Sequence, residues 1–117
     1  MDYAVTKRSR LLAAPPYPVE QALKTLGANL RIARLRRNLG LDEVAEKIGV
    51  NRKSVADAEK GKPSTGIGVY AALLWTYDLT GQLSDVADPT RDKEGLTLAL
   101  ARERTNARRT TDLDNDF

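Results

Sequence analysis

The sequence contains no cysteine and no histidine. Without cysteine the chain can form neither disulfides nor thiolate metal sites, and without histidine it lacks the usual general base and the commonest metal ligand. The stretch Gly61-Lys62-Pro63 is not a phosphate-binding loop, because that motif needs a serine or threonine directly after the lysine. We therefore expect the protein not to be an enzyme and to have no cofactor and no metal site.

Long hydrophobic runs are also lacking. The longest strongly apolar stretch, Val69–Trp75, has seven residues, whereas about 20 are needed to span a bilayer. A second apolar patch follows Lys7, Arg8 and Arg10, but it is short and Pro15-Pro16 interrupts it, which is not typical of a secretory signal. These absences predict a cytoplasmic protein without a membrane segment.

The charged residues are unevenly distributed along the chain. Residues 1–63 contain 13 Lys and Arg against 7 Asp and Glu, a net charge of +6, whereas residues 64–117 contain 6 against 9, a net charge of −3. Charge asymmetry of this kind often indicates a partner, and a basic half can bind a polyanion such as DNA. Charge alone does not separate this interpretation from the ordinary solvated faces of helices.

Apolar residues recur at steps of three and four, which is typical of amphipathic helices. With 117 residues, the chain can bury one modest core. We expect helices from Pro18 to about Asn38 and at 41–48, 52–60 and 81–87, and one more that Ser64 or Thr65 caps and that ends near Tyr77. The fold class is therefore predicted as all-α, with five helices in one compact domain.

Two further helix predictions rest on weaker patterns. The helix that ends near Tyr77 is apolar on more than one side, so we expect burial on more than one side, with Trp75 or Thr76 among its apolar positions. Leu96, Leu98 and Leu100 alternate as they would in a strand, but the composition of 93–109 favours a helix. We choose the helix, followed by an acidic tail.

The second and third predicted helices are joined by a short turn with a defined spacing. Ala45 is small where the two helices must approach closely, since a larger side chain would push them apart. Gly49 lies where the chain must reverse, and glycine takes the positive φ of such a turn without steric cost. Asn51 is a good N-cap, and Val55 faces inward from the third helix. The spacing predicts a rigid helix-turn-helix unit.

The third helix would present Arg52, Lys53 and Ser54 at its exposed N-terminal end. Backbone amides at a helix start favour phosphate. The major groove of DNA admits a helix, and Arg or Lys there can reach guanine O6 and N7. This pattern predicts double-stranded DNA as the partner.

From about Leu26-Gly27 to Leu79 the sequence resembles the XRE or Cro/repressor-type helix-turn-helix regulators. Besides the unit just described, the resemblance rests on Leu30, Arg31, Ala33, Arg34 and Leu39 before it and on residues 58–63, AEKGKP, after it. It implies a repressor-like helix-turn-helix fold and a sequence-specific DNA-binding protein. A dimer of such a protein implies a pseudo-palindromic operator with half-sites about one helical turn, ~34 Å, apart.

The resemblance also implies roles for individual residues. Arg34 and Glu59 would form an ion pair that ties the first helix to the third. The DNA-binding residues that we expect are Asn51, Arg52, Lys53, Ser54, Asp57, Lys60 and Lys62. Of these, Arg52, Lys53 and Asp57 would face the bases. Ser54, Lys60 and Lys62 would lie near phosphates.

Two departures from the family pattern concern the same interface. The family commonly starts its second helix with Thr-Gln, which supplies a cap and a phosphate contact, whereas this chain has Gly40-Leu41. Asp57 stands where the family usually has an amide or a cation. A carboxylate there would repel phosphate, although it could accept a hydrogen bond from cytosine N4.

Outside the unit, the layout of the chain resembles HipB-type antitoxins. The segments that carry this resemblance are LLAAPPYPVEQALKTLGANLR, GIGVYAALLWTYDL and the stretches DPTRDKEGL, ARERTNARR and DNDF. The resemblance implies a homodimeric repressor that autoregulates its operon and neutralises a HipA-like serine/threonine kinase toxin by binding it.

The chain is accordingly expected to have three parts. Residues 1–17 would be a flexible basic arm, residues 18–88 the helix-turn-helix DNA-binding domain, and residues 89–117 a C-terminal helix and tail that contacts a partner or a second copy. Leu113 and Phe117 are the large apolar side chains of the acidic tail, TTDLDNDF, and are candidates for partner binding. A solvated tail is the alternative.

Two other functions stay open at the level of sequence. One is a stand-alone XRE-type regulator without a toxin partner. The other is a protein-interaction module that has lost DNA binding.

Overall fold

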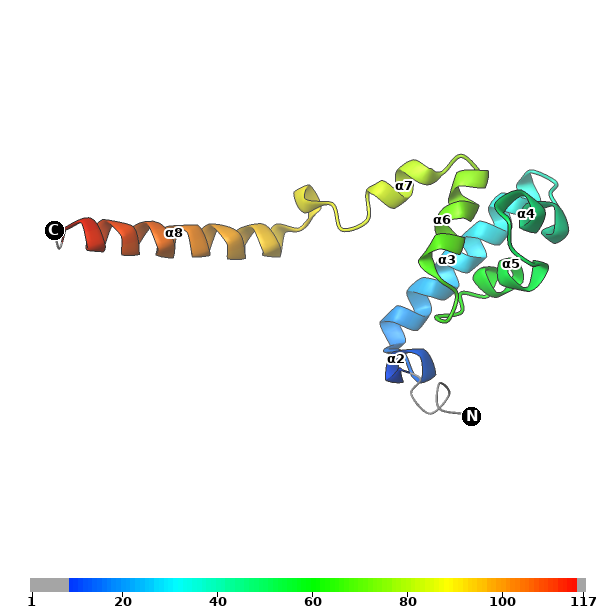
Figure 1. Ribbon diagram of the computed structural model, residues 1–117, viewed down its shortest axis with the longest axis horizontal. Coiled ribbons are helices and arrows are strands. Elements are labelled where there is room, and N and C mark those ends of the chain that lie inside the picture. Colours follow the sequence, from blue (N-terminus) through cyan, green and yellow to red (C-terminus); the bar gives the residue numbers. More distant parts are fainter. Residues whose placement is uncertain (1–8, 116–117) are drawn as a thin grey trace. The chain divides into compact units, whose positions relative to one another are not determined.

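The computed structural model describes the backbone of residues 9–115 and the side chains of residues 9–111. Within that range the chain forms helices and no strands (Figure 1). The helices are α2 (Arg10–Ala13), α3 (Tyr17–Arg36), α4 (Leu41–Ile48), α5 (Arg52–Glu59), α6 (Ile67–Thr76), α7 (Thr80–Ser84), the short 3-10 helix η1 (Pro89–Arg91) and α8 (Lys93–Asn115). The predicted all-α fold class, with a compact helix-turn-helix domain made by α3 to α7, is confirmed.

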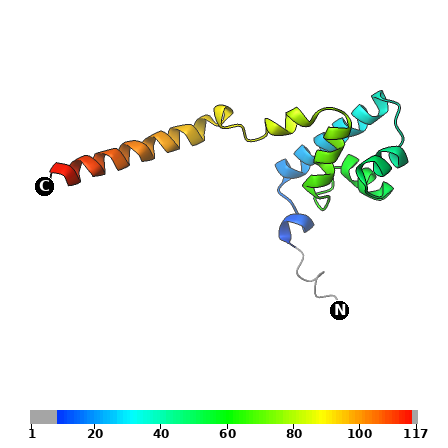
Figure 2. The same ribbon diagram turned by 45° about the horizontal axis from the view of Figure 1, so that its top comes forward.

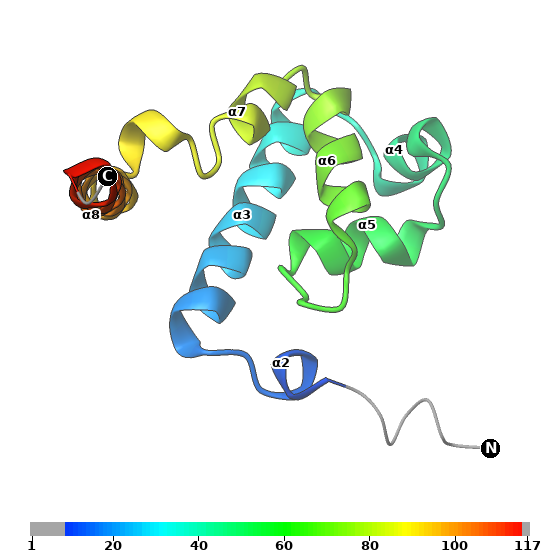
Figure 3. The same ribbon diagram turned by 60° about the vertical axis from the view of Figure 1, so that its left-hand side comes forward.

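The chain divides into two compact units, one that ends at Leu83 and one that starts at Ser84. In the first unit α3 packs against α5, and α4 and α5 both pack against α6 (Figure 3). The buried core of this unit consists of Leu30, Ala33, Val44, Ala45, Val55, Ala58, Tyr70, Leu73, Leu74 and Tyr77. All four helices contribute to it, so the core fixes the position of α5 relative to the other three.

Gly27 allows α3 and α5 to approach closely. A Cβ atom at this position would lie 2.6 Å from the carbonyl oxygens of Ala58 and Glu59 and 2.7 Å from the nitrogen of Gly61. Atoms of folded proteins do not pack that closely. The glycine that weakens α3 by its helix propensity is therefore required by the contact with the end of α5.

Several helix boundaries differ from those expected. The fourth helix of the domain begins at Ile67, with Gly66 rather than Ser64 or Thr65 as its N-cap. The backbone nitrogen of Thr65 donates to the Lys62 carbonyl, 3.1 Å away, so this residue closes a turn before the helix begins.

The arm and the fifth helix of the domain also differ from the prediction. Residues 10–13 of the expected flexible arm form α2, which Ser9 caps by accepting from the Leu11 nitrogen at 3.0 Å. The fifth helix is Thr80–Ser84 instead of 81–87. The chain takes a left-handed conformation at Ala87, with φ 60°, and Asp88 caps η1. A capping side chain thus accounts for the start of α2 and of η1.

Trp75 is 59% exposed, whereas the apolar character of its helix predicted burial on more than one side. The buried residues of α6 are Tyr70, Leu73 and Leu74, which lie on one face. The Lys47 ammonium group lies 5.4 Å from the centre of the indole ring, a cation–π contact that covers part of Trp75. Tyr77 is 1% exposed and belongs to the core.

The second unit contains η1 and α8. Asp92 begins α8 by accepting from the Gly95 nitrogen at 3.0 Å, and residues 95–101, which alternate as in a strand, are helical. The helix continues to Asn115, beyond the expected end at 109, because no glycine or proline interrupts it there. None of the described α8 side chains is buried. No helix in residues 9–115 is both long and apolar enough to cross a membrane.

Candidate nucleic-acid interface

The pair formed by α4 and α5 is held by a short turn (Figure 2). Gly49 ends α4 in the left-handed conformation, with φ 78° and ψ 33°. The nitrogens of Gly49 and Val50 donate to the Ala45 carbonyl at 2.9 and 3.0 Å, which satisfies the end of α4. Ala45 and Val55 are buried between the helices. The turn and the core contacts together fix the angle at which α5 begins.

The start of α5 is capped by Asn51. Its Oδ1 atom accepts from the Ser54 backbone nitrogen at 2.8 Å and from the Ser54 hydroxyl at 2.9 Å. These bonds use the side chains of Asn51 and Ser54 to order the first turn of the helix. The remaining free amides of that turn are available to an anion.

Arg34 joins α3 to α5 through the ion pair with Glu59. The Arg34 Nε atom lies 2.7 Å from Glu59 Oε2, and Nη2 lies 3.0 Å from Oε1, so the contact is bidentate. A third bond runs from Arg34 Nη1 to the Leu39 carbonyl at 2.9 Å. Both side chains are buried, and the hydrogen bond with Glu59 raises the pKa of Arg34. The pair locks the end of α5 against α3.

Arg52 and Lys53 extend from the first turn of α5. Their side chains are 65% and 79% exposed, so the chain itself does not cover them. Arg52 Nη1 lies 3.7 Å from the Asp42 carboxylate on α4, which is itself exposed. An ion pair between exposed groups stabilises the fold by no more than about 1 kcal/mol. The guanidinium group can therefore exchange this contact for one with another anion.

Asp57 is one turn further along α5 and contacts two lysines. Its Oδ2 atom lies 3.3 Å from Lys53 Nζ, and its Oδ1 atom lies 3.2 Å from Lys62 Nζ. The hydrogen bond from Lys62, with a smaller one from Lys53, holds the pKa of Asp57 below its ordinary value despite partial burial. The carboxylate is 17% exposed, and its lowered pKa favours the charged form.

The loop from α5 to α6 carries the remaining predicted phosphate contacts, Lys60 and Lys62. Gly61 takes a φ of 72° there. The Lys62 nitrogen donates to the Asp57 carbonyl at 3.1 Å, and the Tyr70 hydroxyl donates to the Lys62 carbonyl at 3.0 Å. These backbone bonds hold the loop at the end of α5. Tyr70 is not among the residues predicted to support the interface, because no pattern in the sequence pairs its hydroxyl with a loop carbonyl.

The start of α4 lacks a capping side chain, as the sequence Gly40-Leu41 predicts. Gly40 is the N-cap, and the Glu43 carboxylate accepts from its backbone nitrogen at 3.0 Å. This is half of a capping box, because glycine has no side chain with which to return the bond. Asp42 and Glu43 add negative charge at a helix start that faces the cations of α5, and sequence reasoning did not connect Asp42 with Arg52.

The predicted DNA-binding residues lie at the cap of α5, on α5 and in the loop that follows it. The structure brings Lys53 and Lys62 to Asp57 and joins Asn51 to Ser54. Arg52 contacts Asp42 of α4, and Lys60 is exposed at the end of α5. Of the two candidate partner-binding residues, Phe117 lies outside the described residues. Leu113 lies in α8, but its side chain is outside the described range.

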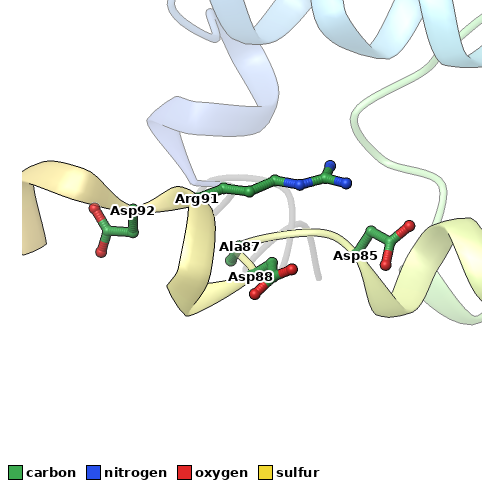
Figure 4. Close-up of a pocket in the computed structure, with 5 residues that line it drawn as sticks. All are labelled: Asp85, Ala87, Asp88, Arg91 and Asp92. Carbon is green, nitrogen blue, oxygen red and sulfur yellow. The ribbon is translucent and has the colours of Figure 1, made fainter. Parts of the chain in front are cut away.

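A concave region lies in the second unit. It is a hollow of about 320 Å³ lined by Asp85, Ala87, Asp88, Arg91 and Asp92 (Figure 4). Asp88 uses its carboxylate to cap η1, and Asp92 uses its own to cap α8. Among the described residues, no group of acidic side chains is arranged to hold a metal ion. Two of the five residues that line this hollow thus act as caps of local helices.

Comparison with known proteins identifies the family of the region that contains α4, α5 and α6. Residues 25–87 match a family model described as a helix-turn-helix domain. An uncharacterized HTH-type transcriptional regulator of Sinorhizobium fredii (strain NBRC 101917 / NGR234), y4mF, is 41% identical over 51 residues, which cover 44% of this chain and 67% of that protein. No solved structure matches the chain significantly. The matched region covers more than half of the chain and contains α4, the turn and α5, so the protein belongs to the helix-turn-helix domain family, with the XRE-like arrangement that its sequence resembles.

Proposed function

We propose that the protein is a sequence-specific DNA-binding transcriptional repressor that acts as a HipB-like antitoxin. In this role a homodimer binds a pseudo-palindromic operator, autoregulates its operon and neutralises a HipA-like kinase toxin by binding it. DNA-binding regulation follows from the helix-turn-helix family and from the relative's description as a transcriptional regulator. The observation that carries the proposal is the exposure of Arg52 and Lys53 at the start of a helix that the core holds rigidly.

DNA recognition divides between two groups of residues. Arg52 and Lys53 enter the major groove and donate to base edges, where a bidentate contact to guanine O6 and N7 distinguishes this base from the other three. Lys60 and Lys62, together with the free amides at the start of α5, bind phosphates and set the register. The Arg34–Glu59 pair and the Tyr70 contact support these groups by holding both ends of the loop and helix.

The antitoxin role rests on the layout of the chain outside the family domain. We assign residues 18–88 to DNA binding and residues 89–117 to a contact with the kinase or with a second copy. The exposed leucines of α8 support this assignment, since Leu96, Leu98 and Leu100 lie in a unit where no described α8 side chain is buried. A helix that exposes this much apolar surface gains stability when a partner covers it.

The DNA-binding part is tested by selecting duplexes from a random library with the wild-type chain and measuring affinity at several salt concentrations. Arg52→Ala should weaken binding to the selected duplex by ~1–3 kcal/mol while changing random duplexes little, and Lys62→Ala should weaken all duplexes alike. Arg36→Ala removes the same charge from a hollow that faces α7, and serves as the control. Equal losses for all three variants on every duplex would exclude groove reading by Arg52.

The antitoxin part needs a separate experiment. The neighbouring gene is first examined for a kinase-like product. If it encodes one, the chain is co-expressed with that product, and the complex is purified with and without residues 110–117. A HipB-like antitoxin restores growth when the kinase is expressed, and deletion of the segment weakens the complex if Leu113 and Phe117 bind the kinase. A neighbouring gene without kinase character, together with intact operator binding, would instead indicate a stand-alone regulator.

A further inference from the structure

Asp57 adds a negative charge to the surface proposed to bind DNA, where a carboxylate repels phosphate. It lies on α5 between Lys53 and Lys62, at 3.3 and 3.2 Å from their ammonium groups. Lys53 is 79% exposed and Lys62 is 44% exposed, so a phosphate can reach both of them from solvent. The cluster of three side chains therefore carries a net charge of +1 instead of +2.

The carboxylate is not needed to hold the loop that carries Lys62. Two bonds that do not involve the Asp57 side chain already fix it: the Lys62 nitrogen donates to the Asp57 carbonyl, and the Tyr70 hydroxyl donates to the Lys62 carbonyl. Both lysine partners of Asp57 are exposed to solvent, so each Lys–Asp57 pair contributes only about 1 kcal/mol to stability. The position of the carboxylate thus has a small structural benefit and a direct effect on the charge of the surface.

We infer that Asp57 is a specificity-determining residue that competes with DNA phosphates for Lys53 and Lys62 and so suppresses binding to non-operator DNA. This inference rests on the proposed DNA-binding function. Non-specific complexes depend almost entirely on phosphate contacts. Each cation that pairs with a carboxylate of the protein is lost to these contacts, and the affinity for non-operator DNA falls accordingly.

The operator complex is affected differently because it also uses base contacts. Asp57 pairs with Lys53 at the i,i+4 spacing of a helix, which restricts the lysine side chain to one direction along α5. Loss of the carboxylate would strengthen attraction to phosphate but would release Lys53 from that orientation. The two effects oppose each other at the operator, whereas only the first acts on random DNA.

The test compares Asp57→Asn with Asp78→Asn in the full-length chain. Asp78 is exposed in the turn that follows α6. It has a φ of 60°, which asparagine accepts readily. The control therefore removes the same charge from the far end of α6, whereas Lys62 lies before the start of that helix. The probes are a duplex selected by the wild-type chain and a pool of random 20-base-pair duplexes. Circular dichroism and thermal melting verify that each variant is folded.

We expect Asp57→Asn to raise affinity for the random pool roughly three- to tenfold and the magnitude of its log–log salt slope by ~0.9, the value of one added phosphate contact. Affinity for the selected duplex changes less, so the ratio of the two affinities falls. Asp78→Asn changes neither slope nor ratio. An equal gain on both probes, or an equal gain from Asp78→Asn, would overturn the inference.

A second variant separates competition for Lys62 from general repulsion. In a Lys62→Met background, Asp57→Asn has one lysine fewer to release, so its gain in slope on the random pool should be smaller than in the wild-type background. The same gain in both backgrounds would show that Asp57 acts only as a charge. If the wild-type chain selects no duplex and binds random DNA without salt dependence, the proposed function itself fails and the inference fails with it.

Discussion

Replacement of Gly27 by alanine tests whether α3 and α5 meet as closely as the structure shows. On helix propensity alone the change stabilises α3, because alanine is favoured over glycine by about 1 kcal/mol within a helix. The added methyl group would, however, lie 2.6 Å from two carbonyl oxygens at the end of α5. These are backbone atoms, so α5 or α3 must move to admit it.

The two effects can be weighed against each other. An extra methyl group forced into a packed site typically lowers the free energy of unfolding by about 1–3 kcal/mol. Because the contacted atoms belong to the backbone and cannot rotate away as a side chain could, we expect a cost near the upper end, ~3 kcal/mol. After subtraction of the propensity gain, we expect Gly27→Ala to lower the free energy of unfolding by about 1–2 kcal/mol. For a domain of this size the melting temperature falls by roughly 4–15 °C.

The measurement is differential scanning calorimetry of the wild type, Gly27→Ala and Gly68→Ala. Gly68 lies in the first turn of α6, and a Cβ there would meet no described atom within 4 Å. The control should therefore stabilise the protein by a few tenths of a kcal/mol up to about 1. If Gly27→Ala also raised the melting temperature, the close contact between α3 and α5 would be refuted.

Three further predictions concern the surroundings of α5. Arg34→Met should cost ~3–5 kcal/mol in urea unfolding because it leaves the buried Glu59 carboxylate unpaired, and an apolar replacement of both residues should recover much of that loss; a loss below 1 kcal/mol would contradict the pairing. The Tyr77 hydroxyl is buried and has no hydrogen-bond partner among the described residues, so Tyr77→Phe should leave stability at pH 7 unchanged or raise it by up to ~1 kcal/mol. Burial raises the pKa of Tyr77 to about 12, so the folded state favours the neutral phenol. Wild-type stability should fall above pH 10, with Tyr77 contributing about 1 kcal/mol at pH 11, and the fall should be smaller by that amount in Tyr77→Phe, where the raised pKa of Tyr70 still contributes. Asn51→Ala should cost ~1 kcal/mol through loss of the cap, whereas Asn51→Asp should cost little.

The helix-turn-helix pair is the part of the fold that sequence predicts best. The expected segment 41–48 coincides with α4, and the expected segment 52–60 differs from α5 by one residue at its end. Both boundaries depend on local chemistry: Gly49 takes a positive φ, and Asn51 caps with its own side chain. Signals that act within four residues of one another can be read from the chain without knowledge of the tertiary structure.

The electrostatic pattern of the surface is less accessible to sequence. Arg52 and Lys53 could be placed at the start of a helix, because their position depends only on the Asn51 cap. The contact between Arg52 and Asp42 joins two helices, and the contact between Asp57 and Lys62 joins a helix to a loop. Such pairs depend on the angle between elements. A count of charges therefore overestimates the positive potential of a surface on which carboxylates pair with cations.

Burial is the property that apolar pattern predicts least well for α6 and α8. Hydrophobic periodicity identifies a buried face only when the other faces are polar, and α6 contains Ile67, Val69, Ala71 and Trp75 in addition to its three buried residues. Nothing local distinguishes Trp75, which is exposed, from Leu74, which is not. In α8 the helix persists through 23 residues although none of its described side chains is buried. Helix propensity accounts for the backbone of α8, because leucine is a good helix former. It does not account for the exposure of Leu96, Leu98 and Leu100, which under the proposed function form the surface that a partner covers.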